Sequence, residues 1–228
     1  MPNSLCIIPA RGGSKRIPKK NIKDFHGKPI IAYSIDTALK SGLFQKVMVS
    51  TDCEEIKRIS LEYGAEVPFL RSESNSDDFA TTIDVVNEVI KSYQSMGRSF
   101  DKLCVLYPCA PFVTKEDLTR AHQMLEKHDC VIPVVKFDFP PLRSFYISES
   151  KLFYKWPDFE KSRSQDLENL YHDAGQWYFI KNEDSFHSSL MKRSTYPFIM
   201  ESIRAQDIDT IYDWKLAELK FQLLNYGI

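Results

Sequence analysis

The sequence has no excess of charge of either sign, because 30 Lys and Arg residues stand against 31 Asp and Glu residues. A general nucleic-acid or membrane-surface binder would show a basic excess, so the balance predicts neither kind of partner. The sequence also lacks an apolar run of membrane-spanning length and an N-terminal secretory signal. Together these absences predict a cytoplasmic protein.

Cysteine is scarce and irregularly spaced. The five cysteines are an odd number, and none of them forms a C-x-x-C pair. The sequence therefore predicts neither a disulfide framework nor a zinc site. Cys6, Cys104 and Cys130 lie within apolar runs, and we expect them to be small residues of the core.

Short β-like runs alternate with longer runs of helical period, in a chain long enough to form one domain over residues 1–228. The expected strands are 4–8, 46–50, 66–70, 102–107, 130–137 and 176–180, and the expected helices are 30–40, 53–63, 82–96, 115–127 and 210–224. Thr51, Thr81 and Thr114 stand at expected helix N-caps, the last two with Asp84 and Asp117 three residues on. Such alternation predicts an α/β fold with a mostly parallel sheet, in which ligands bind beyond the carboxyl ends of the strands.

Residues 138–170 break this alternation. They contain three prolines and seven aromatic residues, with two β-like pieces at 145–147 and 152–155. We expect an arm or hairpin outside the main sheet, with a lid over the core as the alternative. Aromatic side chains on such an arm favour contact with a second subunit.

The loop after the first expected strand combines two adjacent glycines, Gly12 and Gly13, with five basic residues and no acidic residue. Glycines let phosphates approach the backbone closely, whereas five crowded cations repel one another unless an anion or acidic neighbours offset them. The pattern predicts a phosphate-binding loop, with a solvated basic turn as the alternative. It contains neither the P-loop motif nor G-x-G-x-x-G.

The same stretch, IIPARGGSKRIPKKNI at 7–22, resembles the N-terminal signature of the cytidylyltransferases that activate nonulosonic (sialic-type) acids. The resemblance continues through 25–39 and 47–56. It implies a Rossmann-like nucleotide-diphospho-sugar transferase fold, CTP as a substrate, and a homodimer. It also implies two catalytic residues at the reacting phosphates, Arg11 and Lys20. The nucleotide-binding residues that it implies are Ala10, Arg11, Gly12, Gly13, Ser14, Lys15, Lys20, Asn21 and Arg71; for Arg71, a loop ion pair is the alternative.

Two acidic residues, Asp207 and Asp209, are separated by one residue in QDIDTIYDW at 206–214. In extended backbone their side chains can point the same way, as a Mg²⁺ ion bound beside substrate phosphates would require. The alternative is that they stabilise the start of the last helix, where Thr210 and Asp213 would form a capping box. In the family that the chain resembles, such a pair holds the metal, which favours the Mg²⁺ site.

The sugar site is suggested by resemblance. SRSQDLENLYHDAGQWYF at 162–179 resembles the branch of the family that acts on pseudaminic acid, which implies that His172, Asp173 and Gln176 face the sugar. LYPCAP at 106–111 places Tyr107 where sialic acid synthetases carry a sugar-contacting glutamine, which argues against N-acetylneuraminate as the substrate. Tyr107 and Trp177 would offer apolar surface to a sugar with a methyl end.

The predicted reaction is the in-line attack of the sugar's anomeric hydroxyl on the α-phosphate of CTP, giving CMP-pseudaminic acid and pyrophosphate. Catalysis is expected from positioning and charge neutralisation, because the protein forms no covalent bond. One alternative is a synthetase for N-acetylneuraminate or another nonulosonic acid. Others are a hexose-1-phosphate nucleotidyltransferase and an inactive nucleotide-binding regulatory module. The general base is left open among His172, Asp207 and Asp209.

Overall fold

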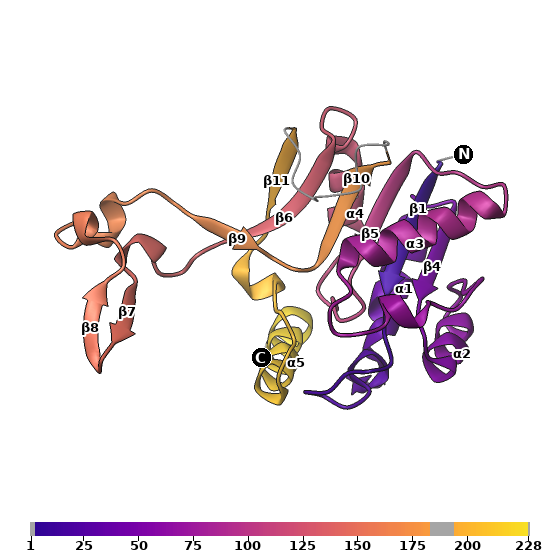
Figure 1. Cartoon of the computed structure of the whole chain (residues 1–228), viewed down its shortest axis with the longest axis horizontal. Helices are drawn as coiled ribbons and strands as arrows, with labels where there is room; N and C mark the ends of the chain where they lie inside the picture. The colour runs from indigo at the N-terminus through magenta and orange to yellow at the C-terminus, as the bar shows by residue number, and fades with distance from the viewer. Residues whose placement is uncertain (1–2, 183–193, 228) are drawn as a thin grey trace.

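The computed structural model describes residues 3–182 and 194–227. At its centre lies a sheet in the order β11-β6-β10-β5-β1-β4, with β9 paired to β6 (Figure 1). β1 is parallel to β4 and β5, and β11 is parallel to β6, whereas β9 and β10 run antiparallel to their neighbours. The predicted mostly parallel α/β sheet is therefore confirmed. Its strands are β1 (Ser4–Pro9), β4 (Lys46–Ser50), β5 (Lys102–Leu106), β6 (Cys130–Lys136), β9 (Tyr171–Asp173), β10 (Trp177–Lys181) and β11 (Thr195–Ile199).

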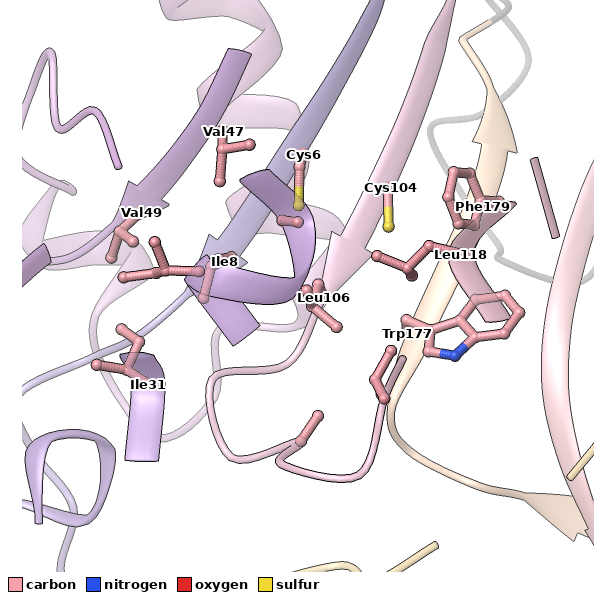
Figure 2. Packing of buried hydrophobic residues seen from close by; sticks show 14 of the residues in the cluster. Cys6, Ile8, Ile31, Val47, Val49, Cys104, Leu106, Leu118, Trp177 and Phe179 are labelled. Atoms are coloured by element: carbon pink, nitrogen blue, oxygen red, sulfur yellow. The ribbon is translucent and has the colours of Figure 1, made fainter. Parts of the chain in front are cut away.

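Two apolar layers cover the sheet because successive residues of a strand point to opposite faces. Cys6 and Ile8 of β1 pack on one face with side chains from α1, α2 and α4 (Figure 2), while Leu5 and Ile7 pack on the other face with α3. Cys104 and Cys130 are buried in the same layers, as predicted. The helices are α1 (Ile30–Ser41), α2 (Glu54–Glu62), α3 (Thr82–Ser95), α4 (Lys115–Met124) and α5 (Ile211–Tyr226). None of the helices in the described ranges is long and apolar enough to cross a membrane.

Two of the three predicted helix N-caps are confirmed. Thr81 and Thr114 each accept a backbone N–H bond from the aspartate three residues on, whose carboxylate bonds back to the cap. The prediction for Thr51 was wrong, because α2 is preceded by Cys53, and the Thr51 hydroxyl instead accepts the backbone N–H of Cys53.

One predicted strand is absent from the structure, and two observed strands were not predicted. Residues 66–70 do not form a strand: Glu66 makes an isolated bridge to Met48, and Pro68, which has no N–H, cannot continue the pairing. β9 and β11 were not predicted from the sequence. β11 contains Pro197, and a proline in a short run argues against a strand when only the sequence is known. Proline is nevertheless tolerated on an edge strand such as β11.

Residues 138–170 form an arm that extends away from the sheet (Figure 1), so the alternative of a lid over the core is wrong. Its hairpin pairs β7 (Phe145–Ser148) with β8 (Lys151–Tyr154), close to the two predicted β-like pieces. Cross-strand rings stack, Tyr146 on Phe153 at 5.5 Å between centroids, but both strands remain largely exposed.

A third apolar cluster joins the opening loop to the end of the chain. Ile17 of the loop and Phe25 of β2 (Asp24–Phe25), which pairs with β3 (Lys28–Pro29), pack against Trp214 and Ala217 of α5. Ile208, which lies between the two aspartates, is buried in the same cluster. The cluster therefore fixes the basic loop beside the acidic pair, although about 190 residues separate them along the chain.

Candidate active site

A cavity of about 420 Å³ opens where β1 ends, at the carboxyl edge of the parallel strands. Its volume is in the range of small-molecule sites. Nine of the predicted site residues line it: Arg11, Ser14, Lys15, Lys20, Asn21, Arg71, Tyr107, Asp207 and Asp209.

The basic loop after β1 is neutralised by carboxylates from three other segments. Arg11 and Lys15 pair with Asp78, which precedes α3, and Arg11 also donates to the backbone carbonyl of Asp77. The two cations hold the pKa of Asp78 below its ordinary value, with the hydrogen bond from Lys15 as the largest cause. The expected repulsion among the loop cations is thus offset by acidic neighbours, and a polyphosphate could take the place of these carboxylates.

The second half of the loop faces the acidic pair. Lys20 Nζ donates to the backbone carbonyl of Ile208 at 2.5 Å and lies 3.4 Å from Asp209 Oδ1, while Arg16 approaches the same oxygen at 2.9 Å. Lys19 points elsewhere and pairs with Glu55 on α2.

The two glycines of the loop have different surroundings. A Cβ on Gly12 would lie 2.9 Å from Cys53 Cβ, so Gly12 is needed for close packing against the turn after β4. Its N–H donates to Asp52 Oδ1 at 2.8 Å. A Cβ on Gly13 would meet nothing within 4 Å, which leaves the backbone there open. Of the two glycines, only Gly13 therefore leaves open space for a ligand to approach the backbone.

Buried polar side chains hold the loop in shape. The Asn21 amide donates to the backbone carbonyl of Arg11 at 3.0 Å and accepts the thiol of Cys109 at 3.4 Å. Arg71 is buried and donates from Nε to Ser50 Oγ at 3.0 Å, and to the Ser50 carbonyl. Within the described residues no carboxylate forms an ion pair with Arg71, so the alternative of a loop ion pair is wrong. Ala10 is buried behind the loop.

Asp207 and Asp209 both line the cavity, and the capping box that was their alternative explanation also exists. Thr210 accepts the N–H of Asp213, and the Asp213 carboxylate returns bonds to Thr210. The box thus uses Asp213 and leaves the other two carboxylates directed to the cavity. Partial burial, and then the negative charge of Asp209, raise the pKa of Asp207. A divalent cation would relieve that repulsion.

The four predicted sugar residues are placed differently. Tyr107 lines the cavity, where its hydroxyl shares a hydrogen bond of 2.9 Å with Thr82 Oγ1. His172 is exposed, and its ring contacts Phe137. Asp173 accepts the Tyr178 hydroxyl and the N–H of Gly175, each at 2.7 Å, and so shapes the turn between β9 and β10.

Gln176 and Trp177 lie behind the cavity wall. Gln176 is buried and donates to the backbone carbonyl of Gln206 at 3.3 Å, so it supports the segment that carries the acidic pair. Trp177 is fully buried against Phe179 and Phe198. The expectation that Trp177 offers apolar surface to the sugar was therefore wrong, because strand alternation turns its ring into the core.

Several residues that line the cavity were not predicted from the sequence. Thr81 and Thr82 come from the start of α3, and Cys109 comes from the loop after β5. Burial raises the pKa of the Cys109 thiol to about 12. Thr81 carried a usable signal, since a helix start at the carboxyl edge of a parallel sheet is a common ligand contact.

Comparison with known proteins identifies the family. The family model for cytidylyltransferases matches residues 5–218. The chain belongs to the cytidylyltransferase family. A pseudaminic acid cytidylyltransferase of Campylobacter jejuni is 41% identical over 227 residues, covering 96% of this chain and 97% of that protein. A CMP-N,N'-diacetyllegionaminic acid synthase of Legionella pneumophila is 33% identical and covers 96% of each chain.

Solved structures agree on the fold of this cytidylyltransferase. A CMP:2-keto-3-deoxy-manno-octonic acid synthetase complexed with CTP superposes with a TM-score of 0.67 at 15% identity, covering 97% of this chain and 98% of that one. At that identity the similarity shows the fold alone. The predicted fold and the predicted class of enzyme, a nucleotidyltransferase, are both confirmed.

Proposed function

We propose that this cytidylyltransferase transfers CMP from CTP to pseudaminic acid and releases pyrophosphate. The observation that carries the proposal is the cavity at the end of β1, where the loop cations face the carboxylates of Asp207 and Asp209. The identity of 41% to a pseudaminic acid cytidylyltransferase, over nearly the whole of both chains, supports the choice of sugar. As an enzyme that consumes CTP, it is proposed to work in the cytoplasm.

In the proposed complex, the triphosphate replaces carboxylates as the partner of the loop. Arg11 and Lys15 exchange Asp78 for phosphate oxygens, so that the cations remain neutralised throughout. Ser14 and the open backbone at Gly13 contact the phosphates from the same side. Asn21 and Arg71 hold the nucleoside end.

The reaction is an in-line displacement. The anomeric hydroxyl of the sugar transfers its proton to a general base, with His172, Asp207 and Asp209 as the predicted candidates, and its oxygen forms a bond to the α-phosphorus. The bond from that phosphorus to the bridging oxygen breaks, so that pyrophosphate leaves. Arg11 and Lys20 neutralise the negative charge that moves between these oxygens.

Asp207 and Asp209 fit a Mg²⁺ site that substrate phosphates complete. Two carboxylates are hard oxygen ligands of the kind that Mg²⁺ prefers. Partial burial, followed by the negative charge of Asp209, raises the pKa of Asp207, and a bound cation would favour the charged carboxylate against both effects. Within 3–182 and 194–227, His, Cys, Asp and Glu residues form no cluster of three that could hold a metal alone. Phosphate oxygens and water would fill the remaining positions. When bound, Mg²⁺ would supply charge neutralisation at the transferring phosphate.

The sugar is proposed to lie against Tyr107. Burial raises the pKa of Tyr107, so its ring presents a neutral, largely apolar surface at pH 7. Pseudaminic acid has an acetamido group and a terminal methyl group where N-acetylneuraminate has hydroxyls. A wall that lacks the glutamine of sialic acid synthetases suits the first sugar better. His172, Asp173 and Gln176 remain predicted sugar residues, and of these only Gln176 is buried behind the cavity wall.

Side-by-side kinetics test the choice of sugar. With saturating CTP and Mg²⁺, kcat/KM for pseudaminic acid should exceed that for N-acetylneuraminate by at least about 100-fold. Comparable values, or a preference for N-acetylneuraminate, would remove pseudaminic acid and leave another nonulosonic acid as the substrate. Failure of every nonulosonic acid to release pyrophosphate would favour an inactive nucleotide-binding module.

We also propose that residues 1–228 form one domain whose arm, residues 138–170, joins two copies into a homodimer. Ile147 on the arm is 76% exposed, and the hairpin that carries it stands away from the central sheet (Figure 1). Light scattering should report a dimer at micromolar concentration, and Ile147→Asp should weaken it. Leu61→Asp, at an exposed apolar site on α2, should not. A monomeric wild type would contradict the proposal.

A further inference from the structure

The two cavity aspartates lie on a stretch that has no regular structure of its own. Between a 3₁₀ turn at Ser202–Arg204 and the start of α5, residues 205–210 form neither helix nor strand. A pair of carboxylates that shares one cation must be held at a fixed spacing. Contacts from neighbouring segments must therefore fix this stretch.

One set of these contacts is made by Arg204, the residue directly before the stretch. Its guanidinium forms a two-pronged ion pair with Asp117 of α4, with Nη1 at 3.3 Å from Oδ1 and Nη2 on Oδ2, and Nη2 also donates to the backbone carbonyl of Phe112 at 3.2 Å. The Asp117 side chain is only 5% exposed. Such a planar fork restricts orientation as well as distance.

Asp117 lies in the first turn of α4, and the loop that leads into this helix forms one wall of the cavity. The loop after β5 contributes Tyr107 and Cys109 to that wall and then runs through Phe112 to the Thr114 cap of α4. Arg204 thus joins the wall that carries the predicted sugar contact to the segment that carries the predicted metal ligands.

The other capping boxes show that capping does not require this arrangement. α3 and α5 begin with the same Thr-x-x-Asp box, through Asp84 and Asp213. Within the described residues neither of those aspartates is buried or forms an ion pair, whereas Asp117 is buried and does. Burial of a carboxylate costs desolvation free energy unless the charge is paired. The ion pair with Arg204 offsets this cost for Asp117.

We propose that Arg204 is a positioning residue: paired with Asp117, it holds Asp207 and Asp209 at the spacing that a Mg²⁺–CTP complex requires. This inference rests on the proposed metal role of the two aspartates. Outer-shell partners of this kind typically contribute 10–100-fold to metal affinity.

Calorimetric titration of the protein with CTP, with and without Mg²⁺, tests the inference without turnover. In the wild type, Mg²⁺ should strengthen CTP binding. The Mg²⁺ gain is the ratio of the Kd for CTP without Mg²⁺ to the Kd with Mg²⁺. In Arg204→Lys, which keeps the charge but loses the fork, and in Asp117→Asn, which still caps the helix, that gain should fall about 10-fold or more. Arg58→Met removes an exposed ion pair with Glu62 on α2 and should leave the gain unchanged.

The double variant Arg204→Met with Asp117→Asn separates positioning from stability. Removing both charges should restore most of the melting temperature that Arg204→Met alone loses, because no unpaired charge stays buried. A positioning role requires that the Mg²⁺ gain stays reduced in the double variant. If the gain returns together with the melting temperature, or if Arg204→Lys and Asp117→Asn bind like the wild type, the inference is wrong.

Asp209→Asn separates this inference from the proposed function. If Asp209→Asn leaves the Mg²⁺ gain intact, the metal assignment itself fails. If Asp209→Asn lowers the gain and the Arg204 variants do not, the metal assignment stands and the role of Arg204 alone is refuted.

Discussion

Replacing Lys20 by methionine removes one positive charge from the cavity while nearly preserving side-chain length. In the free enzyme, Lys20 Nζ donates to the Ile208 carbonyl at 2.5 Å and lies 3.4 Å from Asp209 Oδ1. The Lys20 side chain is 23% exposed. Lys20→Met therefore leaves a backbone acceptor and a carboxylate that water and Arg16 can still reach.

The expected effect on folding is small and that on catalysis is large. A partly exposed ion pair of this kind contributes about 1 kcal/mol or less to stability. A preorganised charge at the transferring phosphate contributes roughly 2–4 kcal/mol to the transition state, because it is already in place when the charge develops. The second figure corresponds to a loss of about 30- to 900-fold in kcat/KM.

The rate of pyrophosphate release from CTP with pseudaminic acid and Mg²⁺ measures the loss in kcat/KM. A thermal melt measures the effect of Lys20→Met on stability. Lys19→Met is the matched control, because Lys19 is the adjacent loop lysine but pairs with Glu55 outside the cavity. We expect Lys19→Met to keep kcat/KM within about threefold of the wild type, since exposed pairs contribute little. A Lys20→Met enzyme with near wild-type kcat/KM would refute the catalytic assignment of Lys20.

Two further predictions follow from pKa values in the cavity. Because the pKa of Asp207 is raised, the folded state favours its protonated form; the stability this gives is complete below the unfolded pKa of about 3.9 and is lost as pH rises through the folded pKa. Asp207→Asn should therefore raise the melting temperature at pH 7 without Mg²⁺. A lower melting temperature of this variant would contradict the conclusion that burial and the charge of Asp209 disfavour the charged Asp207 carboxylate. Burial raises the pKa of Cys109 to about 12, so at pH 8 the thiol stays protonated. Mass spectrometry after iodoacetamide treatment should find Cys109 alkylated far more slowly than the amino acid cysteine in solution, and rapid labelling would contradict the raised pKa.

The amino-acid sequence determined what depends on near neighbours along the chain. Short apolar runs specified the central strands, and Thr81 and Thr114 set helix starts through bonds that span three residues. The hairpin of the arm followed from its local β-like pieces. The basic loop was also readable, because its glycines and cations are contiguous.

Only the tertiary structure decided which distant segments meet. Local pattern could not reveal that Lys20 reaches Asp209, or that Arg204 crosses to Asp117, because those partners are separated by 189 and 87 residues. It also could not tell that Trp177 faces the core, since the antiparallel insertion of β10 between β5 and β6 sets which face each residue takes. Long-range pairing arises from the packing of whole elements, and no short stretch of sequence carries it.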